Sequence, residues 1–201
     1  MAELLGPKTG LSVHRVRAVM AQLHADCNLQ LDTGAATDRD PGATFTDGKL
    51  KLNDPRVVLD YLIEKHQWHG AWADRIEMRA RERAALAAFD AVVVPAFHAT
   101  VRGLTLPVET RKNVVTELRE LAQTAHANGF RVGNALSLWV APAWMRMRWL
   151  REHSPMASMI GEWIELGGWL EAAAALPEVT RTAPSRGEVQ AAVTTRVGGA
   201  A

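Results

Sequence analysis

The sequence predicts a small α/β unit followed by an all-helical unit. Residues 1 to about 66 combine short alternating segments, which are typical of strands, with two segments of helical periodicity. Residues 74 to about 176 show helical periodicity almost throughout. The 201 residues are 48% hydrophobic and 22% charged, which is a globular composition with enough apolar side chains for a core.

The N-terminal unit is expected to begin with strand, helix and strand. Residues 3–6 form a candidate strand, and the Gly and Pro of residues 6–10 indicate a loop. Ser12 is a suitable N-cap for the helix that follows. Residues 27–31 alternate between apolar and polar side chains, which predicts the second strand. The helix has an apolar stripe at helical spacing: Val13, Val16, Val19, Met20 and Leu23.

A hairpin and a second helix complete this unit. Residues 32–42 have the composition of a loop. In residues 43–52, Asp47-Gly48 lies between two alternating runs and is typical of a type I′ hairpin turn. Asp54 before Pro55 predicts a helix start, because a capping carboxylate precedes Pro in the first turn. The apolar face of that helix is Val58, Leu59, Leu62 and Ile63.

The second unit is expected to contain four or more helices. Pro95 is expected to end the first of them, and Gly103 ends the next segment. Asn128-Gly129 is a typical C-terminal stop for a later helix. After Pro177 the chain is rich in Thr, Ser, Gly and Ala, which predicts a mobile tail. The expected helices cover residues 74–94, 108–128, 141–151 and 159–176.

Charge and cysteine content exclude several classes of protein. With 23 Lys+Arg and 22 Asp+Glu the net charge is +1, which does not favour binding to nucleic acid. Cys27 is the single cysteine, so neither an intrachain disulfide nor a multi-cysteine zinc site is expected. The first residues do not have the pattern of a signal peptide, and no run of about 18 uncharged apolar residues is present. We therefore expect a cytoplasmic protein without membrane contact.

Five stretches of the chain carry motifs in a fixed order. They are LSVHRVRAV at 11–19, TDGKLKL at 46–52, VVLDYLIEKH at 57–66, LSLWVAP at 136–142 and LPEV at 176–179 with Arg181 after it. Together they resemble the glutathione S-transferase superfamily. The resemblance implies a thioredoxin-like α/β domain at residues 1–66, an all-helical domain at residues 74–190, and a homodimer.

The resemblance implies that the chain activates the thiol of glutathione as a co-substrate. In this family a hydroxyl at the start of the first helix donates to the sulfur, and the helix N-terminus adds a favourable partial charge. Thr9 and Ser12 are the candidates for that hydroxyl, since neither Tyr nor Cys lies near them. Ser12 has the alternative role of a plain helix cap, and the β-branch makes Thr9 a rarer choice.

The resemblance also implies a cradle for the glutathione peptide. The family uses backbone groups beside a cis-proline, and counting back from the hairpin places Ala43 there, with Pro41 two residues earlier. A non-proline cis bond costs about 2.5–4 kcal/mol, so we expect a trans bond at Ala43. Backbone near Ala43 and Thr44 would hold the peptide, and Asp54 would accept from its ammonium group. The alternative for Asp54 is a helix cap alone.

Three features of the family are altered in this chain. Pro55 stands where the family has Ser, so a hydroxyl and an N–H that would bind the γ-glutamyl carboxylate are missing. The loop at residues 32–42 leaves little room for the family's pocket helix. Ser137 has no acidic residue three positions later, so the core helix of the second domain is expected to start near Pro142.

Several other patterns allow a functional and a plain interpretation. His66 and His69 are three residues apart on a helix, but no third ligand is evident, so no metal site is predicted. His14 and Arg15 could bind an anion. The resemblance places the second substrate, a small apolar electrophile, on the helix with Met78, Arg79, Arg81 and Arg83.

The late helices contain two more such patterns. One is a set of tryptophans, which are expected in the core or in a dimer groove, or alternatively in an apolar pocket. The other is a set of arginines, which form either a basic ridge or a solvated face. These residues are Trp139, Trp144, Trp149, Trp163 and Trp169, with Arg146, Arg148 and Arg151.

Two functional hypotheses follow from these residues. The first is a glutathione transferase-like enzyme that conjugates a thiol to a small apolar electrophile or isomerises it. The second is a non-catalytic interaction protein similar to the stringent starvation protein A group, which Gly6-Pro7 and residues 12–17 resemble loosely. The loss of the Ser at Pro55 favours the second hypothesis, and binding to immobilised glutathione would separate the two.

Overall fold

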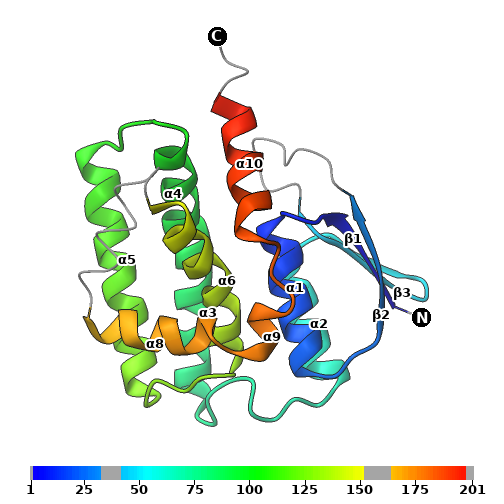
Figure 1. Ribbon diagram of the computed structural model, residues 1–201. Helices are drawn as coiled ribbons and strands as arrows, with labels where there is room; N and C mark the ends of the chain where they lie inside the picture. Colours follow the sequence, from blue (N-terminus) through cyan, green and yellow to red (C-terminus); the bar gives the residue numbers. More distant parts are fainter. Residues whose placement is uncertain (1, 33–41, 152–163, 198–201) are drawn as a thin grey trace.

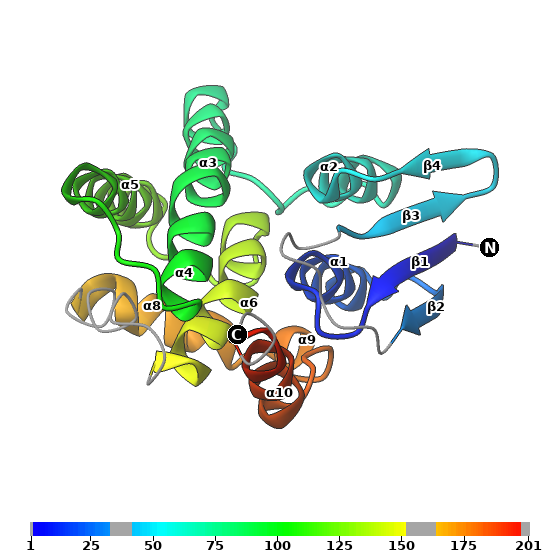
Figure 2. The same ribbon diagram turned by 90° about the horizontal axis from the view of Figure 1, so that it is seen from above.

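A four-stranded mixed sheet forms the N-terminal domain. The computed structural model describes residues 2–32, 42–151 and 164–197 (Figures 1 and 2). The strands are β1 (Ala2–Pro7), β2 (Cys27–Asp32), β3 (Thr44–Asp47) and β4 (Leu50–Leu52). In the order β2-β1-β3-β4, β1 pairs parallel with β2 and antiparallel with β3, and β3 pairs antiparallel with β4. The predicted strands and hairpin are confirmed, and the domain is thioredoxin-like.

The two faces of this sheet differ in polarity. Helices α1 (Leu11–Gln22) and α2 (Pro55–Lys65) lie on the face turned toward the helical domain (Figures 1 and 2), where Leu4 and Phe45 are fully buried. On the other face, the ladder places polar side chains opposite one another across all four strands. A polar outer face allows a sheet to be covered on one side only. The polar row is Asn28, Glu3, Thr46 and Lys51.

The hairpin turn is not of type I′. Asp47 pairs with Leu50, so Gly48 and Lys49 are the two loop residues. Gly48 has a φ of 61°, whereas Lys49 is not among the residues with positive φ. A type I′ turn needs positive φ at both positions, and a type II′ turn needs it at the first, which glycine occupies here.

Two helix starts differ in how well they were predicted. Ser12 is not the N-cap of α1, because Gly10 holds that position and Ser12 is the second helical residue. Asp54 caps α2 as predicted, and its Oδ1 accepts from the backbone N–H of Arg56 at 2.8 Å. Pro55 follows as the first helical residue, where its missing N–H has no intrahelical partner to lose.

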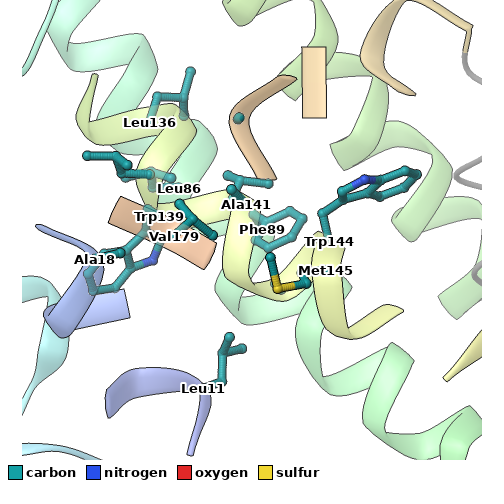
Figure 3. Packing of buried hydrophobic residues seen from close by; sticks show 14 of the residues in the cluster. Leu11, Ala18, Leu86, Phe89, Leu136, Trp139, Ala141, Trp144, Met145 and Val179 are labelled. Carbon is teal, nitrogen blue, oxygen red and sulfur yellow. The ribbon is translucent and has the colours of Figure 1, made fainter. Parts of the chain in front are cut away.

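Helix α6 is the centre of the helical domain and of the core. It is apolar nearly all round, and every residue from Ala135 to Met147 is buried. Figure 3 shows side chains from α1, α3, η1, α6 and α9 gathered in this core. The helical elements are α3 (Ile76–Ala88), η1 (Phe89–Val93), α4 (Val94–Val101), α5 (Val108–Ala127), α6 (Ala135–Trp149), α8 (Ile164–Ala174), α9 (Pro177–Thr180) and α10 (Arg186–Val197).

The predicted break at Pro95 is wrong, because α3, η1 and α4 form one helical run. In η1 the N–H of Val94 donates to the carbonyl of Phe89, five residues earlier. This wider π-turn relieves the clash that the Pro95 ring would make with the preceding carbonyls. By length and composition alone, the run Ile76–Val101 is long and apolar enough to cross a membrane, as core helices of other proteins also are. Here it contributes Leu86, Phe89 and Phe97 to the core.

Helix α6 begins before the predicted start at Pro142. Asn134 is its N-cap, and its side-chain oxygen accepts from the N–H of Ser137 at 2.9 Å. The Ser137 hydroxyl in turn accepts from the N–H of Gly133 at 2.9 Å. This pair replaces the acidic partner that Ser137 lacks, and Pro142 lies inside the helix, among buried neighbours that hold the helix together.

The expectation of a mobile tail after Pro177 is wrong for residues 177–197, which the structure describes. Helices α9 and α10 follow, and the start of α10 is closed by a capping box in which Ser185 and Glu188 bond each other's backbone N–H groups. Glu188 also pairs with Lys8, beside the start of α1, at 2.7 Å. The hydrogen bond from Lys8 is the largest cause that lowers the pKa of Glu188 to about 2. Of the predicted helix at 159–176, residues 159–163 lie outside the described part.

A buried carboxylate ties the helical domain to the connection from α2. Glu82 of α3 is fully buried, and its Oε2 accepts from the N–H of Ala73 at 2.7 Å. Its Oε1 accepts from the side-chain amides of Asn128, which ends α5, and Asn134, which begins α6. Burial is the largest cause that raises the pKa of Glu82. One carboxylate therefore joins three helices and the interdomain segment.

Candidate functional site

An open cleft of about 710 Å³ lies between the two domains. Its walls come from the N-terminus of α1, from the segment that leads into α2, and from the helical run of α3, η1 and α4. On α1 and at the start of α2 it exposes Ser12 and Asp54. The third wall is a stripe at helical spacing: Ala87, Asp90, Ala91 and Val94.

The two candidate hydroxyls have different positions relative to this cleft. Ser12 lines the cleft and is 7% exposed. Thr9 lies in the turn between β1 and α1, half-buried, and is not among the residues that line the cleft. The first turn of α1 carries no acidic residue and its N-cap, Gly10, offers no side-chain cap. The helix N-terminus therefore meets the cleft without a protein carboxylate on it.

The predicted peptide cradle is only partly assembled. Asp54 lines the cleft while it caps α2. Ala43 is buried and Thr44 donates its hydroxyl to Asn53 Oδ1 at 3.1 Å, and neither lines the cleft. The described residues contain no cis peptide bond, so the bond before Ala43 is trans, as predicted. Pro41 lies outside the described residues.

A buried ion pair forms the floor where α1 meets the helical run. The Arg15 guanidinium is 2.7 Å from Asp90 Oδ1. Arg15 also donates to the carbonyl of Trp139 at 2.9 Å and lies 4.8 Å from the centre of its ring. Trp139 Nε1 donates to Asp90 Oδ2 at 2.9 Å. These contacts join α1, η1 and α6 at the cleft. They favour a structural role for Arg15 over a purely anion-binding role.

Two buried side chains, those of Arg146 and His14, join the N-terminal part of α1 and the turn before it to the helical domain. Arg146 of α6 donates to the carbonyls of Thr9 and Gly10. His14 is fully buried and donates from Nε2 to the carbonyl of Val179 at 2.9 Å. Burial, and then the charges of nearby arginines, of which Arg146 is the strongest, lower the pKa of His14 to about 3. His14 is therefore neutral and does not supply charge to an anion.

The residues expected to contact the second substrate do not line the cleft. Met78, Arg79 and Arg81 do not line the cleft, and Arg83 lines a smaller neighbouring pocket beside Trp72. The residues that do face the cleft lie later in the same helical run, in the stripe that begins at Ala87. These residues have the spacing i, i+3, i+4 and i+7 of one helical face, and they lie within the predicted helix at 74–94.

Most of the described tryptophans of the late helices pack in the core. Trp139, Trp144 and Trp169 are in the core, and Trp163 lies outside the described residues. Arg148 is exposed and paired with Glu171, which fits a solvated face. Arg146 fits neither interpretation, because it is 8% exposed and bonds the turn before α1.

Asp90 on the cleft wall and Arg146 beside it are not among the site residues expected from the sequence. Asp90 lies near the end of the helix expected at 74–94, where its charge gives no signal of a site. Arg146 was grouped with its exposed neighbours, although its place four residues after Pro142 in an apolar helix indicates burial. A charged residue inside a helix that is apolar all round needs a partner, and this is the pattern that could have identified it.

No family model and no curated protein sequence matches this chain. Solved structures do match this chain. It is similar to glutathione transferase Omega 1C from Trametes versicolor, with a TM-score of 0.75 and 16% identity over 98% of this chain and 96% of that one. It is similar to Leishmania TDR1, described as a trimeric glutathione transferase, with a TM-score of 0.77 and 16% identity over 100% of this chain and 50% of that one.

A third similar structure is glutathione S-transferase-I bound with lactoylglutathione, with a TM-score of 0.63 and 12% identity over 90% of this chain and 98% of that one. With TM-scores of 0.63 to 0.77, all three structures share the overall fold of this chain. The chain has the glutathione transferase fold.

Proposed function

We propose that this protein is a glutathione transferase-like enzyme that conjugates a thiol to a small electrophile, or isomerises it, in the interdomain cleft. One observation carries the proposal: the N-terminus of α1 opens into a cleft of about 710 Å³ with Ser12 on its wall. The stripe of Ala87, Ala91 and Val94 offers apolar surface for the electrophile. A cytoplasmic location and a homodimer are part of the proposal.

The thiol would be activated by hydrogen bonding and by the helix dipole. A thiolate at the start of α1 gains from the partial positive charge of the helix N-terminus. The hydroxyl of Ser12 would donate to the sulfur, and the proton of the thiol would leave to solvent. Thr9 is the second candidate for the same hydrogen bond, since it stands three residues earlier in the turn.

Glutathione is the proposed thiol. A similar structure holds lactoylglutathione, which supports a glutathione-derived ligand in this fold. Asp54 on the cleft wall would accept from the γ-glutamyl ammonium group, with backbone near Ala43 and Thr44 along the peptide. Because Pro55 provides neither hydroxyl nor N–H, we expect weaker binding of the γ-glutamyl carboxylate than a Ser at that position would give.

Calorimetric titration with glutathione, together with a thiol conjugation assay, tests this proposal. Ser12→Ala is expected to reduce conjugation by about tenfold or more, as the loss of one hydrogen bond to a developing charge does. Thr9→Ala tests the second candidate, and Thr105→Ala, at an exposed loop position, is the matched control. Unchanged conjugation in both Ser12→Ala and Thr9→Ala would reject the hydroxyl mechanism.

The non-catalytic hypothesis keeps one specific observation in its favour. Pro55 occupies the cleft wall beside Asp54, where a ligand carboxylate would need a donor. In that case the fold would present a surface to a protein partner, as in the stringent starvation protein A group. Retention on immobilised glutathione separates the two: retention supports the enzyme, and its absence supports the interaction protein.

A further inference from the structure

A buried arginine from the helical domain reaches the turn that precedes α1. Arg146 Nη1 is 2.5 Å from the carbonyl oxygen of Thr9, and Nη2 is 3.0 Å from that of Gly10. The two contacts use the fork of one guanidinium on two successive carbonyls. Arg146 is 8% exposed, so both bonds lie in a poorly solvated setting where charged hydrogen bonds are strong.

The carbonyls of Thr9 and Gly10 lie directly before the first helical residue. The same turn is held from the N-terminal domain by the bond from the N–H of Gly10 to the carbonyl of Pro7, at 2.8 Å. Carbonyl oxygens carry partial negative charge, which disfavours an anion at the start of α1. A guanidinium bonded to both oxygens offsets this effect and adds a full positive charge.

We propose that Arg146 is a positioning residue for the thiolate site: its fork fixes the turn at Thr9 and Gly10 so that the start of α1 and Ser12 face the cleft, and its charge favours a thiolate there. This rests on the proposed function. The step that Arg146 assists is the loss of the S–H proton of a bound thiol to solvent. Arg146 forms no covalent bond and remains protonated throughout.

Two substitutions separate the charge of Arg146 from its geometry. Arg146→Lys keeps the charge but cannot make the same two parallel bonds. Arg146→Gln removes the charge. We expect the pKa of bound glutathione to rise in both, more in Arg146→Gln, and conjugation at neutral pH to fall by about tenfold for each unit by which that pKa rises. Raising the pH should restore conjugation, which loss of structure would not do.

The thiolate absorbance of bound glutathione across a pH series gives the pKa directly. Arg148→Gln is the matched control, because Arg148 is exposed, lies two residues later on α6 and pairs with Glu171. A wild-type thiol pKa in Arg146→Gln would overturn the electrostatic part of the proposal. If Arg146→Gln does not fold, Arg146→Lys still tests the two parallel bonds, and a wild-type thiol pKa in Arg146→Lys would overturn the positioning part of the proposal.

Hydrogen exchange without any ligand tests the turn itself. Faster exchange of the N–H groups of residues 8–12 in Arg146→Lys than in the wild type is expected, with Arg148→Gln unchanged. Equal exchange would overturn the positioning role. If the wild type binds no glutathione, the proposed function fails and the electrostatic part fails with it, whereas the exchange result still supports or overturns the hold of Arg146 on the turn.

Discussion

Arg15 of α1 and Asp90 of η1 form an ion pair of 2.7 Å that crosses the boundary between the two domains. Both side chains are largely buried, with 5% and 19% exposure, and both are also hydrogen-bonded to Trp139. Removing one member of such a pair leaves the other charge buried without its partner. The pair therefore links the folding of the sheet domain to that of the helical domain.

Replacing Asp90 by Asn is expected to lower the free energy of unfolding by about 3 kcal/mol, because it leaves the Arg15 charge in a poorly solvated place. Arg15→Met should have an effect of similar size. The double variant should lose less than the sum, and urea unfolding in a double-mutant cycle measures the difference.

An exposed ion pair provides the contrast for this cycle. Lys112 and Glu109 of α5 are 3.7 Å apart with side chains that are 70% and 76% exposed. Lys112→Gln is expected to change stability by less than about 1 kcal/mol. Additive effects of Arg15→Met and Asp90→Asn would contradict the coupling that we derive from the geometry.

Glu82 predicts a pH dependence with a definite sign. Its pKa is raised by burial, so between pH 4.5 and the higher native pKa the native state holds a proton that the unfolded chain has lost. The contribution of Glu82 to stability is therefore largest below pH 4.5 and falls as pH rises through this window. Urea unfolding at a series of pH values should show this fall, and Glu82→Gln should remove it.

At neutral pH Glu82→Gln is expected to be less stable than the wild type by about 1–3 kcal/mol. The carboxylate accepts from Ala73 on one oxygen and from Asn128 on the other. A Gln amide must turn one N–H toward one of these donors, which leaves two buried donors facing each other. Glu77→Gln, on an exposed position of the same helix, is the control. A variant as stable as the wild type would show that Glu82 is not the hub that its contacts indicate.

Features that depend on neighbours in the sequence are predictable, whereas features that depend on distant contacts are not. The cap at Asp54 and the hairpin at Gly48 depend on neighbours within a few residues, and both were found from the sequence. Pro95 and Pro142 stand inside helices because a π-turn and a fully buried environment outweigh their local preference. Helix propensity alone could not predict either outcome.

Residues of the cleft were harder to predict than the fold. The contact of Arg146 with Thr9 joins positions 137 residues apart, and nothing in the local sequence around either residue indicates the other. Asp90 faces the cleft because it shares one helical face with Ala87 and Val94, one turn away on either side. Ser12 and Asp54 were found because the resemblance placed them, and the structure adds that both line one cleft.

His14 predicts that the protein becomes less stable as the pH falls below about 6.5. Its pKa is about 3 in the native state against 6.5 in the unfolded chain, so the unfolded chain binds the extra proton in this window. Within this window, His14 alone lowers the free energy of unfolding by about 1.4 kcal/mol for each pH unit. His14→Gln should flatten the stability profile between these values. Equal slopes in the wild type and His14→Gln would contradict the burial of a neutral imidazole.

At Gly6, strand β1 lies so close to α1 and to the segment before β3 that a side chain has no room. A Cβ at this position would lie 2.7 Å from Val13 Cγ2 of α1 and 3.1 Å from the carbonyl oxygen of Gly42, and φ is 157°. Gly6→Ala therefore has to push α1 away from β1 or from the segment before β3, and we expect a loss of about 1–3 kcal/mol in urea unfolding. Gly187→Ala in α10 meets no atom within 4 Å and should be neutral or slightly stabilising. Because Gly42 also lines the cleft, Gly6→Ala should weaken glutathione binding as well. Wild-type stability in Gly6→Ala would show that β1 and α1 are not packed as closely as the structure has them.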